Sequence, residues 1–151
     1  MEAKEVQKRV DEFSQTCRQY GIKATHQRRE IYREIARTTE HPDAETIYHR
    51  VRKRIPEISL DTVYRTLHLL ETKGLIARAG FHGDKTRFDA NTDHHHHFVC
   101  TECGFMGDFY HEEWNDFGAR SDVRAMGTVN SIYVELRGLC KACQSKSRKN
   151  G

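Results

Sequence analysis

The sequence predicts an α+β fold with two parts, a helical part that ends in a β-hairpin and a smaller α/β part. Up to residue 74, apolar side chains recur every three or four positions, which is typical of amphipathic helices. After residue 90 the pattern alternates, and this stretch holds a run of four histidines and two Cys-x2-Cys pairs. The excess of Lys and Arg over Asp and Glu lies before residue 90. We therefore expect two small domains, 1–90 and 91–151, with a hinge near 88–93.

Two helices are expected at the start of the chain. The first runs from Glu5 to Tyr20 and ends at Gly21, because Gly is the common residue at a helix C-terminus. The second begins after Thr25, a good N-cap residue. Apolar residues fall on one face of each helix and are expected in the core: Val6, Val10, Phe13 and Cys17 in the first, and Ile31, Ile35 and Ala36 in the second.

Two more helices follow a break at residues 41–43. Pro42 disfavours helical geometry at the preceding residue and suits the first turn of a new helix, which Pro56 closes. The fourth helix opens at Ser59 and has Gly74 as its C-cap. The inward-facing residues are expected to be Ile47, Val51 and Ile55 in the third helix, and Leu67 and Leu70 in the fourth.

A β-hairpin is expected next, with strands over residues 75–80 and 86–88 on either side of the turn-rich loop 81–85. Helices followed by such a hairpin indicate a winged helix. In that fold the helix before the hairpin lies in the major groove of DNA, and the hairpin, or wing, contacts the backbone. The residues that suit these contacts are Ser59, Thr62, Tyr64, Arg65, Lys85 and Arg87. The alternative is that they are solvated polar positions on a protein-binding helical domain.

The second part is expected to be a small sheet with one helix. Its strands are predicted over residues 95–99, 105–110 and 128–136, and its helix over residues 111–124. The tail from about residue 144 is polar and basic, so we expect it to be disordered.

The two Cys-x2-Cys pairs predict a structural zinc site. Two thiolates on each of two tight turns can converge on one tetrahedral Zn²⁺, and a four-thiolate site has no open position for catalysis. The ligands would be Cys100, Cys103, Cys140 and Cys143. The alternative is buried thiols or two disulfides, but the chain has no signal peptide and no apolar run of membrane-spanning length, which favours the reducing cytoplasm. We expect Cys17 to be a free thiol that binds no metal and is not reactive.

The run of four histidines predicts a second metal site. Because side chains alternate along a strand, His95 and His97 project to one side, and His94 and His96 to the other. Further ligands could come from three other places in the chain: Asp89, Asp108 and His41. A mixed His and Asp set favours Fe²⁺, Mn²⁺ or Zn²⁺ and can bind reversibly enough to sense the ion. The alternatives are a solvated hinge between domains and an adventitious metal trap.

Five motifs follow one another in a specific order: His41-Pro42, Asp61-Thr62-Val63-Tyr64-Arg65-Thr66-Leu67, Arg87-Phe88-Asp89, His95-x-His97-x2-Cys100-x2-Cys103-Gly104 and Cys140-x2-Cys143. Together they resemble the ferric uptake regulator (Fur) family, from about Val6 to Cys143. The resemblance implies a homodimeric, metal-dependent transcriptional repressor that binds a palindromic double-stranded DNA operator. It implies an N-terminal winged helix and a C-terminal dimerisation domain in which the four cysteines hold structural zinc. It also implies a regulatory site for Fe²⁺ or Mn²⁺ at His41, Asp89, His95, His97 and Asp108.

Within the family the chain is most similar to the peroxide-responsive PerR branch, since Asp89 and Asp108 stand where iron-uptake regulators tend to carry glutamate. This similarity implies that Fe²⁺ at the regulatory site reduces peroxide and that the oxidant attacks His41 and His95, after which iron is lost and DNA is released. The alternative within the family is a repressor that responds to iron or zinc level. His94 and His96 could alter the metal preference or form an extra site on the opposite face of the strand. Some relatives use a histidine of the late strand for a further site, and this chain has Ile132 there, which speaks against that site.

The alternative of another class is a zinc-dependent hydrolase built on the His and Asp residues. No general-base motif such as His-Glu-x-x-His accompanies these histidines, and a basic helix-and-hairpin part has no role in such an enzyme. The sequence therefore favours a regulator that is not an enzyme, with no membrane partner and no small-molecule substrate beyond peroxide.

Overall fold

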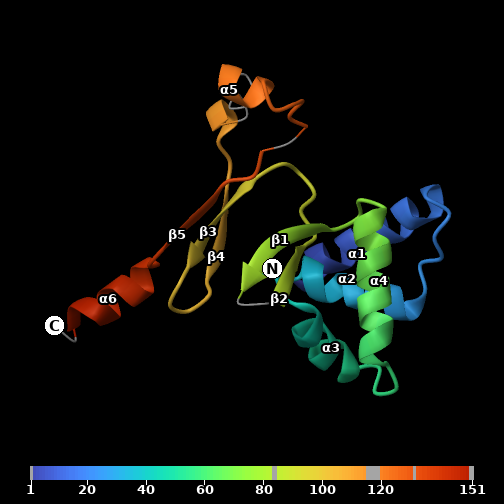
Figure 1. The fold of residues 1–151 in the computed structure, drawn as a ribbon. Helices are drawn as coiled ribbons and strands as arrows, with labels where there is room; N and C mark the ends of the chain where they lie inside the picture. Colours follow the sequence, from blue (N-terminus) through green and yellow to red (C-terminus); the bar gives the residue numbers. More distant parts are fainter. Residues whose placement is uncertain (1, 83–84, 115–119, 131, 150–151) are drawn as a thin grey trace. The chain divides into compact units, whose positions relative to one another are not determined.

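The computed structural model describes residues 2–82, 85–114, 120–130 and 132–149. The chain divides into two compact units, Met1–Thr92 and Asp93–Gly151. None of the described helices is long and apolar enough to cross a membrane. The first unit holds four helices and a hairpin, and the second holds a three-stranded sheet with two short helices (Figure 1).

The four expected helices are present in the first unit. They are α1 (Ala3–Gln19), α2 (His26–Ala36), α3 (Ala44–Arg52) and α4 (Leu60–Thr72). The left-handed backbone conformation that stops a helix occurs at Gly21 and Gly74, with φ of 69° and 72°. Both glycines therefore end their helices as the sequence predicts.

Side-chain caps fix the start of three of these helices. The oxygens of Thr25, Asp43 and Ser59 accept hydrogen bonds from backbone amides three residues later, at 3.3, 2.7 and 3.0 Å. The position of Pro42 was predicted wrongly: Asp43 is the N-cap of α3, so Pro42 lies before the helix and not in its first turn. A carboxylate that reaches the exposed amides is the stronger start signal here.

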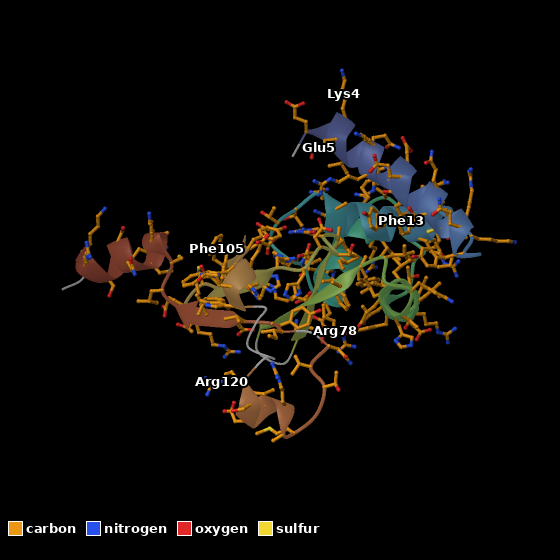
Figure 2. The ribbon with its side chains drawn as sticks, turned by 90° about the horizontal axis from the view of Figure 1, so that it is seen from above. Lys4, Glu5, Phe13, Arg78, Phe105 and Arg120 are labelled. Carbon is orange, nitrogen blue, oxygen red and sulfur yellow. The ribbon has the colours of Figure 1, made fainter. Side chains whose placement is uncertain are left out.

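The core of the first unit is formed by the inward faces of the helices, as the spacing predicts. Phe13 stacks on Tyr32 with ring centroids 4.1 Å apart, which joins α1 to α2. Figure 2 shows Phe13 on the inner face of α1, whereas Lys4 and Glu5 extend outward at the start of that helix. The buried cluster also contains expected apolar residues of the later helices: Ile31, Ile35, Ile47, Val51, Ile55, Leu67 and Leu70. Val63 of α4, which the spacing did not single out, is buried with them.

The expected hairpin follows α4. Strand β1 (Ala77–His82) pairs antiparallel with β2 (Lys85–Asp89), and the register shifts between Arg78 and Gly80. The strands extend into both ends of the loop predicted at 81–85, and residues 83–84 lie outside the described part of the chain. The first unit is therefore a helical bundle with a wing.

The second unit is built around β3 (His96–Cys100), the central strand of a sheet ordered β4-β3-β5. Strand β4 (Met106–Phe109) pairs antiparallel with β3, and β5 (Glu135–Gly138) pairs parallel with it. Helices α5 (Ser121–Arg124) and α6 (Lys141–Lys149) lie at opposite ends of the sheet (Figure 1).

Three expectations for the second unit differ from the structure. Strand β5 covers only the end of the stretch 128–136, because β3 begins at residue 96 and its pairing with β5 starts at His97 and Glu135. Of the helix expected over 111–124, the structure contains one short turn at 112–114 and then α5, and residues 115–119 lie outside the described part. The tail expected to be disordered from residue 144 is helical in α6, whose first turn is anchored by the buried Cys143.

Ion pairs between two buried carboxylates and a surface arginine link α2 to the turn after α3. The guanidinium of Arg54 donates to Glu30 at 2.5 Å and to Glu34 at 2.7 Å, and the Glu34 side chain has no exposed surface. Burial raises the pKa of the Glu30 carboxyl, but hydrogen bonds from Arg54 and Arg33 outweigh it and hold that pKa below its usual value. These ion pairs fix the approach of α3 to α2.

Replacing Arg54 with Met is expected to destabilise the first unit by about 2 to 3 kcal/mol, because Glu34 would stay buried with one weaker partner. Urea unfolding followed by the helical circular dichroism signal measures this loss. The exposed Lys53→Met is the matched control and should change stability by less than about 0.5 kcal/mol. The difference between parent and Arg54→Met should shrink as the pH falls through the lowered pKa of Glu30, because protonation removes the charge that Arg54 stabilises. Equal stability of the two proteins at neutral pH would contradict this role.

Candidate metal centres and nucleic-acid interface

Four cysteines converge at one end of the sheet in the second unit. Cys100 ends β3, Cys103 lies in the turn that follows, and Cys140 and Cys143 lie at the start of α6. Their sulfur atoms are all within 4.8 Å of one another, and the Sγ atoms of Cys103 and Cys140 are 3.8 Å apart. All four thiols are free. Sulfur atoms around tetrahedral zinc, with Zn–S bonds of about 2.3 Å, are about 3.8 Å apart, so this group fits a zinc ion.

Backbone hydrogen bonds shape the turn that carries this cluster and favour the thiolate form of one of its cysteines. The tight turn after β3 closes with a hydrogen bond from the amide of Gly104 to the carbonyl of Cys100, and Gly104 has a φ of 75°. Amide hydrogen bonds from Cys103 and Cys140 hold the pKa of the Cys100 thiol well below its ordinary value. Hydrogen bonding to Cys140, together with burial, raises the pKa of Cys143. One thiolate is thus favoured before any ion binds.

A second group of possible ligands lies on one face of the same sheet. The Nε2 atoms of His95 and His97 are 3.6 and 3.3 Å from Oδ1 of Asp108. His97 and Asp108 are direct cross-strand partners in the pairing of β3 with β4. The alternation of side chains along β3 therefore brings two imidazoles and a carboxylate together, a set that suits a divalent first-row ion.

The other two histidines of the run lie on the opposite face, as the alternation predicts. The rings of His94 and His96 are 5.2 Å apart. His96 is only 1% exposed, and its Nδ1 accepts a hydrogen bond from the amide of Val134 at 3.1 Å. Burial lowers the pKa of His96 and favours the neutral ring. Packing against Phe109 and Trp114 then makes His96 part of the folded core of this unit.

A third group lies in the first unit, where the loop before α3 meets the wing. Nε2 of His41 is 3.0 Å from Oδ2 of Asp89, the last residue of β2. The other carboxylate oxygen of Asp89 accepts a hydrogen bond from the amide of Asn91. This unit therefore contributes one imidazole and one carboxylate, the same ligand types as the group around Asp108.

The residues expected to contact DNA lie at α4 and on the wing, and all but one of them leave their side chains at the surface or bound to other side chains. Ser59 caps α4 and contacts the hydroxyl of Thr62, and Tyr64 is 50% exposed. Arg65 and Lys85 are exposed but each forms an ion pair at 2.8 Å, with Asp61 and Glu45 respectively. Nearby carboxylates thus neutralise the charges of Arg65 and Lys85 in this structure.

Arg87 is the exception, because its guanidinium donates hydrogen bonds to the backbone carbonyls of Glu40 and His41. The sequence did not lead us to expect these hydrogen bonds. A signal was available, since residues i and i+2 of a strand lie on one face, which puts Arg87 beside the predicted ligand Asp89. The unusual backbone of His41, with a φ of 55°, leaves no mark in the sequence.

The family model, the similar sequences and the similar structures all indicate the same family. The model of the ferric uptake regulator family matches residues 19–135. The peroxide-responsive repressor PerR of Staphylococcus aureus (strain Mu50 / ATCC 700699) is 30% identical over 146 residues, which cover 97% of this chain and 99% of that protein. A structure of a zinc-bound manganese uptake regulator is 30% identical, with a TM-score of 0.64, and covers 87% of this chain and 98% of its own. A zinc uptake regulator complexed with zinc and DNA is 21% identical, with a TM-score of 0.76 and coverage of 95% and 97%, and shares the fold.

Replacing Cys103 with Ser is expected to reduce bound zinc from about one ion per protomer to nearly none and to unfold the second unit, because the metal supplies much of the folding free energy of so small a domain. Cys103 is exposed, so the substitution removes a ligand without removing core packing. Cys17→Ala, in the first unit, is the control and should keep full zinc content. Atomic absorption and the melting of the second unit measure both effects. A Cys103→Ser protein that keeps its zinc would contradict the assignment.

Proposed function

Because the chain belongs to the ferric uptake regulator family, we propose that it is a metal-dependent transcriptional repressor that senses peroxide through oxidation of its own ligand histidines. Proteins of this family are transcriptional regulators and not enzymes. The chain binds operator DNA as a homodimer and uses zinc together with a regulatory divalent ion. The regulatory ion is Fe²⁺ or Mn²⁺ in this proposal, and the operator is palindromic.

The observation that carries the proposal is that each unit holds only part of a coordination set. The first unit offers His41 and Asp89, and the second offers His95, His97 and Asp108. Neither part reaches the roughly four to six ligands that divalent first-row ions take. In the proposal a single ion draws on both parts, so binding free energy depends on how the two units are oriented.

Binding of the ion then acts as a population shift. Before binding, the hinge near 88–93 allows many orientations of the winged helix relative to the dimerisation domain. Afterwards the five side chains favour one orientation, and the ion can favour it only by the difference in its affinity for the competing states. In a dimer this orientation would hold two α4 helices one turn of DNA apart, or a multiple of it, which matches a palindromic operator.

On DNA, α4 is proposed to enter the major groove and the wing to contact the backbone. Ser59 and Thr62 would bind a phosphate at the start of α4, and Tyr64 and Arg65 would reach bases or phosphates. Lys85 would leave Glu45 for a phosphate of the adjacent backbone. The site formed by Cys100, Cys103, Cys140 and Cys143 has a structural role, because four thiolates leave no position open for another ligand.

The peroxide response rests on the chemistry of the ligands. Both carboxylates of the set are aspartates, and relatives at 30% identity over almost the whole chain are named as peroxide-responsive repressors. Bound Fe²⁺ would supply one electron to hydrogen peroxide, whose O–O bond would break to give hydroxide and a hydroxyl radical. The radical would add to a ring carbon of a nearby imidazole, and loss of a proton and of one electron, which would return to the iron, would leave one added oxygen atom. The imidazoles of His41 and His95 lie beside the two carboxylates and would be the groups that take up an oxygen atom. Loss of their lone pairs as ligands would release the ion and then the operator.

A response to metal level alone is the second candidate. A zinc-bound manganese uptake regulator is also 30% identical to this chain, and the mixed His and Asp set does not separate iron, manganese and zinc. Such a repressor would share the conformational switch but leave its histidines unmodified.

The switch predicts that His95→Ala keeps fold, zinc and dimer but loses the response of operator binding to Mn²⁺. DNA selected from a random pool by the Mn²⁺-loaded parent serves as the operator. The parent should bind it about 10- to 100-fold more tightly with Mn²⁺ than without, as measured by fluorescence anisotropy. His49 is exposed and belongs to neither group of proposed metal ligands, so His49→Ala is the control and should respond as the parent does. If His95→Ala keeps the full response, the switch is wrong.

Peroxide sensing predicts one added oxygen atom on His41 or His95 after Fe²⁺-loaded protein meets peroxide. Peptide mass spectrometry locates the added atom, and the same anisotropy assay follows release of DNA. Protein loaded with Mn²⁺ is the control and should remain unmodified, because Mn²⁺ does not supply the electron as readily. Unmodified histidines in the iron form, together with DNA binding set by metal concentration, would favour the metal-level repressor.

A further inference from the structure

The loop that carries His41 has an unusual backbone. Among the described residues, His41 is the non-glycine residue with a positive φ, at 55°. This left-handed conformation is unfavourable for residues with a side chain, so it persists only where surrounding contacts hold it. The two residues that follow also have constraints, since Pro42 has a fixed φ and Asp43 caps α3.

The contacts that hold this loop come from β2. Nε of Arg87 donates to the carbonyl of His41 at 2.7 Å, and a second guanidinium nitrogen donates to the carbonyl of Glu40. The amide of the next strand residue, Phe88, donates to the carbonyl of Pro42 at 3.1 Å. Three consecutive carbonyls of the loop are thus bound by two consecutive residues of the wing. The planar guanidinium can bind two carbonyls at once, which an ammonium group cannot do in the same geometry.

The same strand also holds the side chain of His41. Asp89 lies two residues after Arg87, on the same face of β2, and its Oδ2 is 3.0 Å from Nε2 of His41. Strand β2 therefore contacts His41 at both ends, the backbone through Arg87 and the imidazole through Asp89.

We propose that Arg87 is a positioning residue for the regulatory metal: it holds the loop 40–42 so that the imidazole of His41 is aimed before the ion binds. This inference rests on the proposed metal site. It replaces the contact with DNA that the sequence predicts for Arg87. Its physical basis is that a ligand already held in place loses less conformational freedom on binding, so the ion binds more tightly.

The other cations of the wing differ from Arg87 in their surroundings. Arg78 on β1 and Lys85 on β2, both exposed, end at carboxylates, those of the half-buried Glu71 and the exposed Glu45. Figure 2 shows the labelled side chain of Arg78 extending outward from the hairpin. A phosphate can replace such a partner from solvent. The guanidinium of Arg87 would have to give up two carbonyls of its own chain, which favours a role inside the protein.

The test measures Mn²⁺ binding to zinc-loaded dimer in the absence of DNA, by isothermal titration calorimetry. Arg87→Met should weaken Mn²⁺ binding about 10- to 100-fold, the range for partners that orient metal ligands. Arg87→Lys should be weakened less, because an ammonium group can bind one carbonyl at a time. Arg78→Met, an arginine lost from the neighbouring strand of the same wing, should bind Mn²⁺ as the parent does.

Hydrogen exchange of the metal-free proteins gives a second measurement. In Arg87→Met, amides of residues 38–44 should exchange faster than in the parent, while those of α1 and α2 should be unchanged. This result would show that the loop is loosened before any ion is present. It also separates a local effect from general destabilisation of the first unit.

The outcomes distinguish this inference from the proposed function. If the parent binds no Mn²⁺ beyond its zinc, the proposed regulatory site is wrong. If the parent binds Mn²⁺ and Arg87→Met binds it equally well, the positioning role is overturned, and a loss of operator affinity alone would return Arg87 to a phosphate contact. If Arg87→Met does not fold, Arg87→Lys decides: parent-like affinity overturns the inference, and weaker binding with faster exchange at residues 38–44 supports it.

Discussion

The organisation of the second unit depends on strand β3, because its two faces and its end carry different chemistry. One face presents His95 and His97 to Asp108 of β4, the other buries His96, and the last residue, Cys100, is part of the thiol cluster. Both neighbouring strands are needed. Antiparallel β4 supplies the carboxylate, and parallel β5 brings Val134 to His96 and leads on to Cys140. A shift of one residue in either pairing would exchange the two faces and disperse both sites.

The two units are stabilised by different means. The first has a large apolar core and the ion pairs of Arg54 with Glu30 and Glu34. In the second, the buried apolar residues that the structure describes are few: Val99, Cys100, Met106 and Cys143. Half of them are cysteines of the thiol cluster, so a metal takes the place that a larger core holds in the first unit.

Local chemistry decided which parts of the fold could be predicted from the sequence. The caps at Thr25 and Ser59, the stops at Gly21 and Gly74 and the cysteine pairs act through residues next to them, and each is found as expected. Long-range partners could not be read from such patterns. The alternation over 128–136 gives a strand only where β3 lies alongside, and the basic tail becomes α6 because Cys143 fixes its first turn. Arg87 was assigned by its charge, whereas its partners are carbonyls more than forty residues earlier in the chain.

If α4 and the wing bind DNA as proposed, their ion pairs affect how the protein searches a chromosome. Asp61 and Glu45 already neutralise Arg65 and Lys85, and the formal net charge of the chain is only +3. Attraction to random duplex depends mainly on uncompensated positive charge, so wrong sequences should hold this protein only briefly. Residence time on the genome would then be governed by geometry and base contacts, which keeps most molecules available for the few sites where they act.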